Sequence, residues 1–363
     1  MRIKFGYKFK LAKNLPENYI VLSNHVTDYD PIFVGLSFRR QMYFVASEHI
    51  SRWGMAYKFL KYGFEPIIRY KGAIAASTVM DVLRKVKKGG SVCIFAEGNR
   101  TWDGVTASIL PSTAQLIKAA KCGLITYRIE GGYFVSPAWS EKGTRRGHIK
   151  GAPVNIFTKE QIAAMSEDEI YEIINRDLYE DAYERQLAKP KKYKGKQPAY
   201  RLENLLFICP ECHAHGKLST HKDTVTCSEC GHKFTYNEYG MLEGTKFKTV
   251  KELSEWQKSE VAKDAENGAV YRSESGRISA IGKGTEKLIS EGELTMTQES
   301  IKCGDFEIPL SSVPDLAIHG KHSLVFSGGE QYYELTPIKD DNAVKFLLLF
   351  SEYKKVKQTL IQQ

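Results

Sequence analysis

The sequence predicts an α/β fold for the first half of the chain, followed by two smaller β-rich units. In that half, short apolar runs alternate with amphipathic segments of helical length, which is typical of a mixed sheet flanked by helices. Two Cys-x-x-Cys pairs come after the middle of the chain, and short alternating segments separated by Gly, Pro and Ser follow them. These features predict a small cysteine-rich unit and then a C-terminal β-rich domain with a terminal helix.

Composition limits the class of protein. The chain has 363 residues, more than one ordinary core holds, and its 42% hydrophobic and 26% charged content is that of a globular protein. The net charge of +9 fits an anionic partner: phospholipid headgroups, an acidic carrier protein or nucleic acid. No apolar run approaches the ~18–20 residues of a membrane span, and no signal peptide is visible. We therefore expect a cytoplasmic protein, peripheral on the inner face of the membrane and without a transmembrane helix.

The chain begins with alternating apolar and basic residues. Residues 2–11 have the period of two that predicts an edge strand, with its basic face outward. A basic membrane-binding arm is the alternative for this segment.

A polar loop then follows a buried strand at residues 19–22, and Pro31 opens the next helix. Such a loop lies at the carboxyl edge of an α/β sheet, where ligands usually bind. It carries His25 and Asp30, and a carboxylate on one ring nitrogen would fix the tautomer and leave the other nitrogen free to accept a proton. A helix-capping aspartate beside an incidental histidine is the alternative interpretation.

The remaining elements of this half follow in order. Strands are expected at residues 42–46, 65–69, 91–96, 124–129 and 144–150, and helices at residues 50–64, 73–88, 111–121 and 166–182. The segment 50–64 combines Trp53 and Phe59 with Arg and Lys side chains. It fits either a core-facing helix or a helix that lies at the membrane interface beside the His25 loop.

Three of these segments carry motifs of one family: Asn24-His25 followed by Asp30, Arg69 after an apolar run, and Phe95-Ala-Glu-Gly-Asn-Arg100. Over roughly residues 1–185, the chain resembles the 1-acyl-sn-glycerol-3-phosphate (lysophosphatidic acid) acyltransferases of glycerolipid synthesis. It departs from the usual pattern at Thr27, Ala96 and Asn99, where the family more often has serine, proline and threonine.

The resemblance implies acyl transfer from a thioester, acyl-CoA or acyl carrier protein, to the free hydroxyl of lysophosphatidic acid, which gives phosphatidic acid in phospholipid biosynthesis. His25 would be the general base, and Asp30 would orient it. A related acyltransferase with a different lysolipid or a glycerol-phosphate acceptor is the alternative within the family.

Four further residues are candidates for substrate binding. Arg69 and Arg100 would hold the phosphate of the acceptor, because a fork of donors suits oxygen anions. Glu97 and Gly98 would shape the turn, with Glu97 accepting from acceptor hydroxyls or from neighbouring donors.

The two cysteine pairs predict a metal site. Cys209, Cys212, Cys227 and Cys230 have the spacing of a zinc ribbon, in which four thiolates close the shell of a structural Zn²⁺. A redox site would need only one pair. Histidines that lie close enough to replace a ligand are His213, His215, His221 and His232.

These observations divide the chain into an acyltransferase domain (1–187), a solvated basic linker (188–204), a zinc ribbon (205–240) and a β-rich domain (245–363) similar to a pleckstrin-homology (PH) barrel. The rival hypothesis is a zinc-ribbon protein that binds nucleic acid, and a catalytically inactive lipid-binding scaffold is a third. The His25/Asp30 pair favours the enzyme, so we do not expect nucleic acid as a partner. Salt-sensitive binding to oligonucleotides without acyl transfer would favour the rival.

Overall fold

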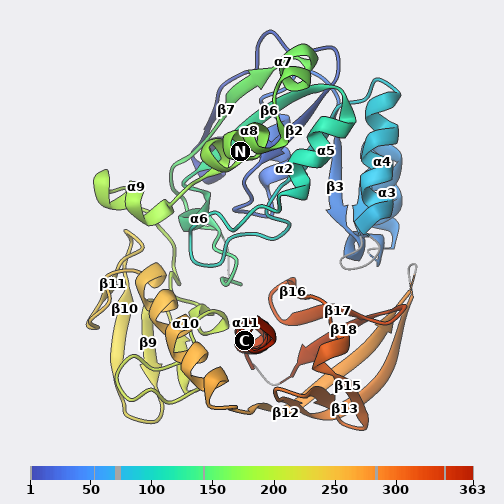
Figure 1. Cartoon of the computed structure of the whole chain (residues 1–363). Helices are drawn as coiled ribbons and strands as arrows, with labels where there is room; N and C mark the ends of the chain where they lie inside the picture. Colours follow the sequence, from blue (N-terminus) through green and yellow to red (C-terminus); the bar gives the residue numbers. More distant parts are fainter. Residues whose placement is uncertain are drawn as a thin grey trace.

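The computed structural model describes residues 2–52, 54–69, 75–141, 144–282, 285–338 and 341–362. Its three sheets follow one another along the chain: a mixed seven-stranded sheet, a four-stranded sheet around the cysteines, and a second seven-stranded sheet (Figure 1). The predicted fold class is therefore confirmed.

The first sheet has the strand order β1-β7-β6-β2-β5-β3-β4, and its neighbouring strands are parallel except for the pair β6 and β7. Its central strand is fully buried, as its continuous apolar sequence predicts. The strands are β1 (Tyr7–Phe9), β2 (Tyr19–Ser23), β3 (Tyr43–Ser47), β4 (Ile67–Arg69), β5 (Val92–Phe95), β6 (Gly123–Glu130) and β7 (Ile149–Phe157).

Helices cover both faces of this sheet. One apolar cluster joins Ile20 and Leu22 of β2 to Val82, Ile117 and Ile174, which belong to α4, α5 and α8. The alternate residues of β2 face the other cluster, together with α2. The helical elements of this part are α1 (Arg2–Phe5), α2 (Asp30–Gly35), η1 (Glu48–Arg52), α3 (Met55–Phe64), α4 (Ala75–Lys87), α5 (Ser112–Ala120), α6 (Gly132–Val135), α7 (Lys159–Ala164), α8 (Glu167–Leu178) and α9 (Ala182–Ala188).

The N-terminal segment differs from the continuous strand that its alternation predicts. Residues 2–5 form a helical turn, and only β1 pairs at the sheet edge. Gly6 separates the two elements with a φ of +64°, and a Cβ there would lie 1.9 Å from the carbonyl oxygen of Gly147. The turn places Phe5 against Tyr29 and Phe33, so Phe5 is buried beside the loop that carries His25.

The helix expected over residues 166–182 is two helices. A capping box at Ser166 starts α8 as the sequence predicts, but α8 ends at Leu178. Asp181 then caps α9 by accepting hydrogen bonds from the backbone N–H groups of Tyr183 and Glu184. The break turns the chain toward the cysteine-containing part.

The sequence predicted that the basic stretch at residues 189–196 is solvated, but parts of it pack against the rest of the protein. Tyr193 is buried against Phe134, and Lys194 pairs with Arg146 in an isolated β-bridge. A short η2 (Leu202–Asn204) then leads into the second sheet, whose order is β11-β10-β9-β8. Its strands are β8 (Leu218–His221), β9 (Thr224–Cys227), β10 (Lys233–Tyr236) and β11 (Leu242–Glu243).

The C-terminal part begins with the long helix α10 (Val250–Glu266) and ends with α11 (Ala343–Gln362). Between them lies an antiparallel sheet of order β15-β14-β13-β12-β18-β17-β16, with η3 (Leu310–Ser312) after β15. Its strands are β12 (Tyr271–Ile281), β13 (Glu286–Met296), β14 (Ser300–Cys303), β15 (Phe306–Pro309), β16 (Leu316–His319), β17 (Ser323–Gly328) and β18 (Gln331–Pro337).

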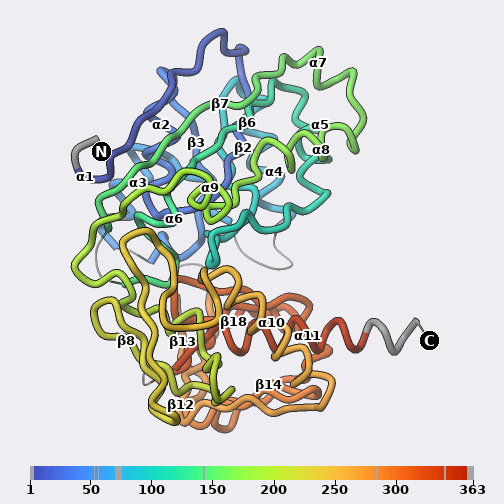
Figure 2. The backbone as a smooth tube through the Cα atoms, turned by 90° about the vertical axis from the view of Figure 1, so that its left-hand side faces the viewer, coloured from blue at the N-terminus to red at the C-terminus, as the bar shows by residue number. Residues whose placement is uncertain are grey.

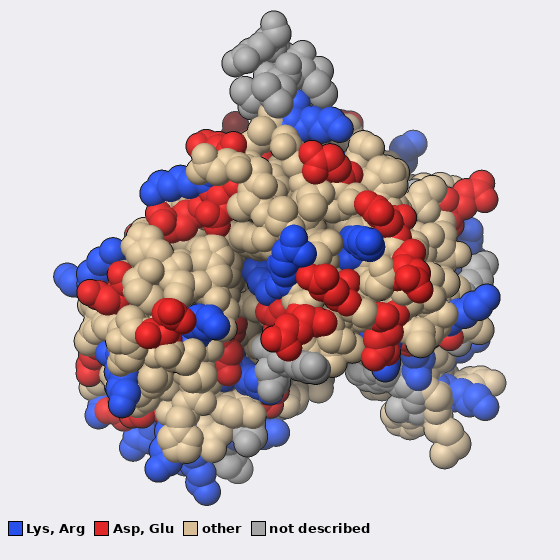
Figure 3. Space-filling model, turned by 90° about the horizontal axis from the view of Figure 1, so that it is seen from below, with Lys and Arg blue, Asp and Glu red and all other residues tan. Residues whose placement is uncertain are grey.

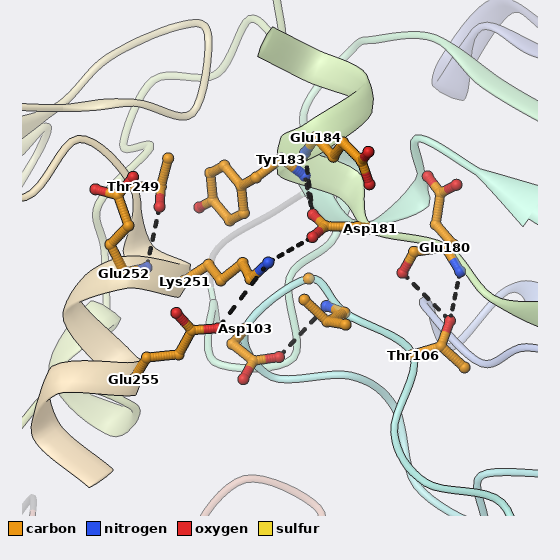
Figure 4. A network of polar contacts seen from close by, with 12 residues as sticks. Asp103, Thr106, Glu180, Asp181, Tyr183, Glu184, Thr249, Lys251, Glu252 and Glu255 are labelled. Carbon is orange, nitrogen blue, oxygen red and sulfur yellow. Dashed lines mark hydrogen bonds and ion pairs between the residues drawn. The ribbon is translucent and has the colours of Figure 1, made fainter. Parts of the chain in front are cut away.

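The three parts are packed on one another rather than strung out. One cluster of buried apolar residues extends from Phe5 in the first part to Tyr353 in α11, and Figure 2 shows the first sheet stacked above the other two. At the junction, Lys251 of α10 forms an ion pair with Asp181 (2.6 Å; Figure 4). Lys258 of the same helix forms one with Asp103 (2.8 Å). The start of α9 and the loop after β5 are thus both held by α10.

Candidate active site and metal site

The loop between β2 and α2 brings His25 and Asp30 into contact. Nδ1 of His25 lies 2.8 Å from Oδ2 of Asp30, and the aspartate is fully buried. The carboxylate also accepts hydrogen bonds from the backbone N–H groups of Val26 (2.6 Å) and Thr27 (2.9 Å) and from the hydroxyl of Thr27 (2.6 Å). With these donors the buried carboxylate is held in one orientation, and it fixes the histidine ring in turn.

The other side of the His25 ring is packed but not covered. The ring stacks on Phe95, with 4.4 Å between the centroids, and the side chain remains 21% exposed. Within the described part of the chain, Nε2 of His25 has no hydrogen-bond partner. It is therefore the nitrogen that could exchange a proton with a substrate.

Glu97 holds this loop in place through hydrogen bonds to backbone N–H groups. Oε1 accepts from the backbone N–H of His25 (2.6 Å), and Oε2 accepts from the backbone N–H of Ala107 (2.7 Å). Glu97 was expected to accept hydrogen bonds either from acceptor hydroxyls or from neighbouring donors, and the structure shows the contacts with neighbouring donors. Burial raises the pKa of the Glu97 carboxyl to about 8, although both backbone donors act to lower it.

The loop is also tied to the sheet by Asn24, which sequence reasoning noted in the motif but gave no role. Its side-chain amide donates to the carbonyl of Ile129 (2.9 Å) and accepts from the N–H of the same residue (2.8 Å). Thr27, whose hydroxyl fixes Asp30, was likewise treated only as a departure from the family pattern. The position of Asn24 directly after a buried strand was the sequence signal that could have predicted its hydrogen bonds to the backbone.

Arg69 and Arg100 both lie at the turn after β5. Gly98 has a φ of +73°, which favours glycine, and a Cβ added there would fall 2.5 Å from Nη1 of Arg69 and would displace this guanidinium. Nη1 of Arg100 lies 3.2 Å from Oδ2 of Asp28 in the His25 loop. Burial lowers the pKa of Arg69, and Asp315 and Tyr332 act in the opposite direction.

The predicted catalytic and substrate-binding residues are thus brought into one connected group. His25 contacts Asp30 and Glu97 directly, Gly98 contacts Arg69, and Arg100 reaches the His25 loop through Asp28. In this arrangement His25 could remove a proton from a group that lies near the guanidinium groups of Arg69 and Arg100.

The four cysteines lie together at the second sheet. Their sulfurs are all within 4.8 Å of one another, with 3.8 Å between Cys209 and Cys230 and between Cys212 and Cys227. Four sulfurs at ~2.3 Å from a tetrahedral zinc would be ~3.8 Å apart, so the spacing fits that ion.

The two knuckles repeat one backbone conformation. His213 donates its N–H to the carbonyl of Cys209, and Gly231 donates to the carbonyl of Cys227; both donors have a positive φ. Two of the nearby histidines are engaged by acids of α10, since His213 lies 3.0 Å from Glu260 and His215 lies 3.6 Å from Asp264. Among the described residues, the candidate metal group consists of the cysteines alone.

Comparisons with known proteins cover the segments that contain both groups of residues. The Acyltransferase family model matches residues 7–131, which include His25, Asp30, Arg69, Glu97 and Arg100. This confirms the resemblance for the first part of the chain, which is an acyltransferase domain. Residues 202–238, which contain the cysteines, match the zinc-ribbon family described as the DNA-directed RNA polymerase 7 kDa subunit. A search of curated proteins gave no match.

Two solved structures are similar to parts of the chain. The 1-acyl-sn-glycerophosphate (LPA) acyltransferase PlsC from Thermotoga maritima has 19% identity and a TM-score of 0.41, over 50% of this chain and 72% of that chain. The N-terminal PH domain of human ARAP2 has 14% identity and a TM-score of 0.20, over 24% of this chain and 81% of that chain.

Proposed function

We propose that the protein transfers an acyl group from a thioester, acyl-CoA or acyl carrier protein, to the free hydroxyl of lysophosphatidic acid, giving phosphatidic acid. The observation that carries the proposal is the contact of His25 with a fully buried Asp30, whose oxygens accept three further hydrogen bonds, inside a region that matches the acyltransferase family.

In this mechanism His25 acts as the general base through Nε2. It takes the proton of the acceptor hydroxyl while the hydroxyl oxygen attacks the thioester carbonyl carbon, and Asp30 stabilises the imidazolium that forms. The C–S bond then breaks, and the departing thiolate takes the proton from His25. A thioester has a good leaving group, so no covalent enzyme intermediate is needed.

The phosphate of the acceptor would bind at Arg69 and Arg100. Both guanidinium groups lie at the turn after β5, and Arg69 forms no ion pair with the described residues, although Asp315 and Tyr332 act on its charge. A planar fork of donors suits a phosphate better than a single ammonium does.

We further propose that Cys209, Cys212, Cys227 and Cys230 hold a structural Zn²⁺. Four thiolates leave no open coordination position, so the ion would stabilise the fold and take no part in acyl transfer.

The acceptor is an amphiphile, and we propose that the enzyme meets it at an anionic membrane surface. Among the described residues, no helix is both long and apolar enough to cross a bilayer. On α3, however, Met55, Phe59 and Tyr62 recur at helical spacing and are 84%, 71% and 91% exposed. Lys58 and Lys61 are exposed beside them, the composition of a helix at a lipid interface. Trp53, expected to take part in this contact, lies outside the described residues.

Nucleic-acid binding is less well supported. The zinc ribbon and the net charge permit it, but on the face drawn in Figure 3 Asp and Glu are interspersed with Lys and Arg.

The test is to incubate the purified protein with lysophosphatidic acid and, separately, with each thioester donor, and to analyse the lipids by mass spectrometry. Formation of phosphatidic acid with either donor is expected. Failure with both donors, together with salt-sensitive oligonucleotide binding, would replace the proposal with its rival.

A further inference from the structure

The loop after β5 holds His25 by both of its backbone groups. The N–H of Thr101 donates to the carbonyl of His25 (3.0 Å). On the other side, the Glu97 carboxylate accepts from the N–H of His25 (2.6 Å) and from the N–H of Ala107 (2.7 Å). The position of the histidine ring relative to a substrate therefore depends on where the 101–107 loop lies.

The 101–107 loop lies in turn against the connection between α8 and α9. Val105 and Asp181 form an isolated antiparallel bridge. Beside it, the hydroxyl of Thr106 accepts from the N–H of Glu180 (2.9 Å; Figure 4), and the N–H of Thr106 donates to the carbonyl of Glu180 (3.0 Å). The loop and this connection thus form one short paired structure, so a contact that fixes one of them also fixes the other.

Two lysines of α10 hold both halves of this paired structure. Nζ of Lys251 lies 2.6 Å from Oδ2 of Asp181, and Nζ of Lys258 lies 2.8 Å from Oδ2 of Asp103. The two lysines are about two helical turns apart, which places them on the same face of α10. One face of this helix therefore contacts the α8–α9 connection and the 101–107 loop at the same time.

The ion pair of Lys251 is the more buried of the two. The Asp181 side chain is 4% exposed; its Oδ1 accepts from the N–H groups of Tyr183 and Glu184, and its Oδ2 contacts the lysine. The ammonium also lies 3.9 Å from Glu255, whose side chain is 57% exposed. Loss of Lys251 would leave a buried carboxylate without its cation, which costs more than loss of an exposed pair. The second lysine of α10 is 45% exposed, so its contact should contribute less.

We propose that Lys251 and Lys258 are positioning residues for the general base. They would hold the 101–107 loop in the place that sets the backbone of His25, and through the backbone the direction of Nε2 toward the acceptor hydroxyl. A helix outside the matched acyltransferase region would then complete the active site. This inference rests on the proposed acyl transfer, and it gives α10 a role in the rate of the reaction rather than in substrate binding.

The test replaces each lysine by methionine, which keeps the length of the side chain and removes its charge. A misplacement of about 1 Å can lower a rate by about 10²-fold, so Lys251→Met should lower kcat for lysophosphatidic acid by roughly tenfold or more, and Lys258→Met by less. The KM for both substrates should not change. Lys251→Arg should recover most of kcat, because it restores a cation at the buried carboxylate.

Lys263→Met is the matched control. Lys263 belongs to the same helix, and its ion pair (2.6 Å) is with Glu260 of that helix rather than with a residue of the acyltransferase domain. This variant should keep the kcat of the wild type, which separates loss of the contact between the domains from loss of a lysine on α10.

Amide exchange measures the same effect without the reaction. Lys251→Met should speed exchange in residues 23–30, which include the N–H of His25 that Glu97 holds, and should leave residues 19–22 of β2 protected. If the wild type transfers no acyl group but its exchange responds to Lys251→Met in this way, the positioning role stands and the proposed reaction fails.

Unchanged kcat together with unchanged exchange in both methionine variants would overturn the proposal. A fall in kcat that comes with a raised KM for both substrates and with faster exchange throughout the first sheet would overturn it as well, because the two lysines would then only stabilise the fold.

Discussion

At the scale of single residues, the histidine–aspartate pair is the feature whose removal should matter most. His25→Ala should lower kcat by about 10²–10⁴-fold, the range for general-base catalysis, with little effect on folding because the ring is partly exposed. Steady-state kinetics with a melting curve checks both points. Turnover within about tenfold of wild type would contradict the general-base assignment.

Asp30→Asn should be as severe, for a second reason besides the loss of ring orientation. An amide has one acceptor oxygen where the carboxylate has two, and Asp30 accepts from Val26, Thr27 and His25 together. We expect kcat to fall and the melting temperature to drop as well. Full activity in this variant would mean that Asp30 serves only to hold the loop.

Glu97 should make stability depend on pH. Burial raises the pKa of its carboxyl from 4.5 to about 8, so the folded chain keeps a proton that the unfolded chain has released. This stabilisation is fully present below pH 4.5 and is lost as the pH rises toward 8. The melting temperature of the wild type should therefore fall between pH 5 and 8 relative to Glu97→Gln, which cannot titrate there.

Glu97→Gln should also be less stable at every pH where the carboxylate accepts both backbone N–H groups, because the amide leaves one donor unpaired. Glu266→Gln, at the exposed end of α10, is the control. Parallel melting curves for wild type and Glu97→Gln across the pH range would rule out the titration of Glu97.

At the scale of elements, the sequence was informative where the signal is local. A continuous apolar run predicted β2, a capping box predicted the start of α8, and the cysteine spacing predicted that the four thiols lie together. The sequence prediction was wrong where a long-range contact determines the local structure. Gly6 bends because of the approach of Gly147. Residues 189–196 are ordered through contacts with Arg146 and Phe134. The contacts of Lys321 with Ser140 and of His322 with Glu141 join residues 181 apart in the sequence and have no local signal. The predicted domain limits stay predictions.

The exposed face of α3 leads to a prediction about membrane binding. This helix runs directly into β4, whose last residue is Arg69, so lipid contact there would place the candidate phosphate site near the surface. Phe59→Ser with Tyr62→Ser should weaken sedimentation with vesicles that contain anionic lipid, and high salt should release the wild type. The double variant Leu288→Ser with Ile289→Ser removes exposed apolar side chains from β13 instead and should bind as wild type. Equal binding of the two double variants would assign the contact to another surface.

At the scale of the whole molecule, the proposed zinc site is connected to the active site by a continuous series of contacts. His213 in the first knuckle lies against Glu260 of α10, and Lys258 of the same helix pairs with Asp103 in the loop after β5. That loop also contains Ala107, whose N–H donates to the Glu97 carboxylate, and this carboxylate also accepts from the backbone N–H of His25.

Removing the metal should therefore do more than unfold the ribbon. Zinc contributes folding energy to small units with little core of their own, so chelation should loosen residues 202–238 first. Because α10 loses support on that side, amide exchange should also rise in residues 101–107 and acyl transfer should fall, while the β2–β5–β6 centre of the first sheet stays protected. Metal analysis should find about one zinc per chain before chelation, and added zinc should restore both readouts. If the metal-free protein keeps its activity and its exchange in residues 101–107, the ribbon and the catalytic loop are independent. If protein purified without chelator contains no zinc, the metal site itself is rejected.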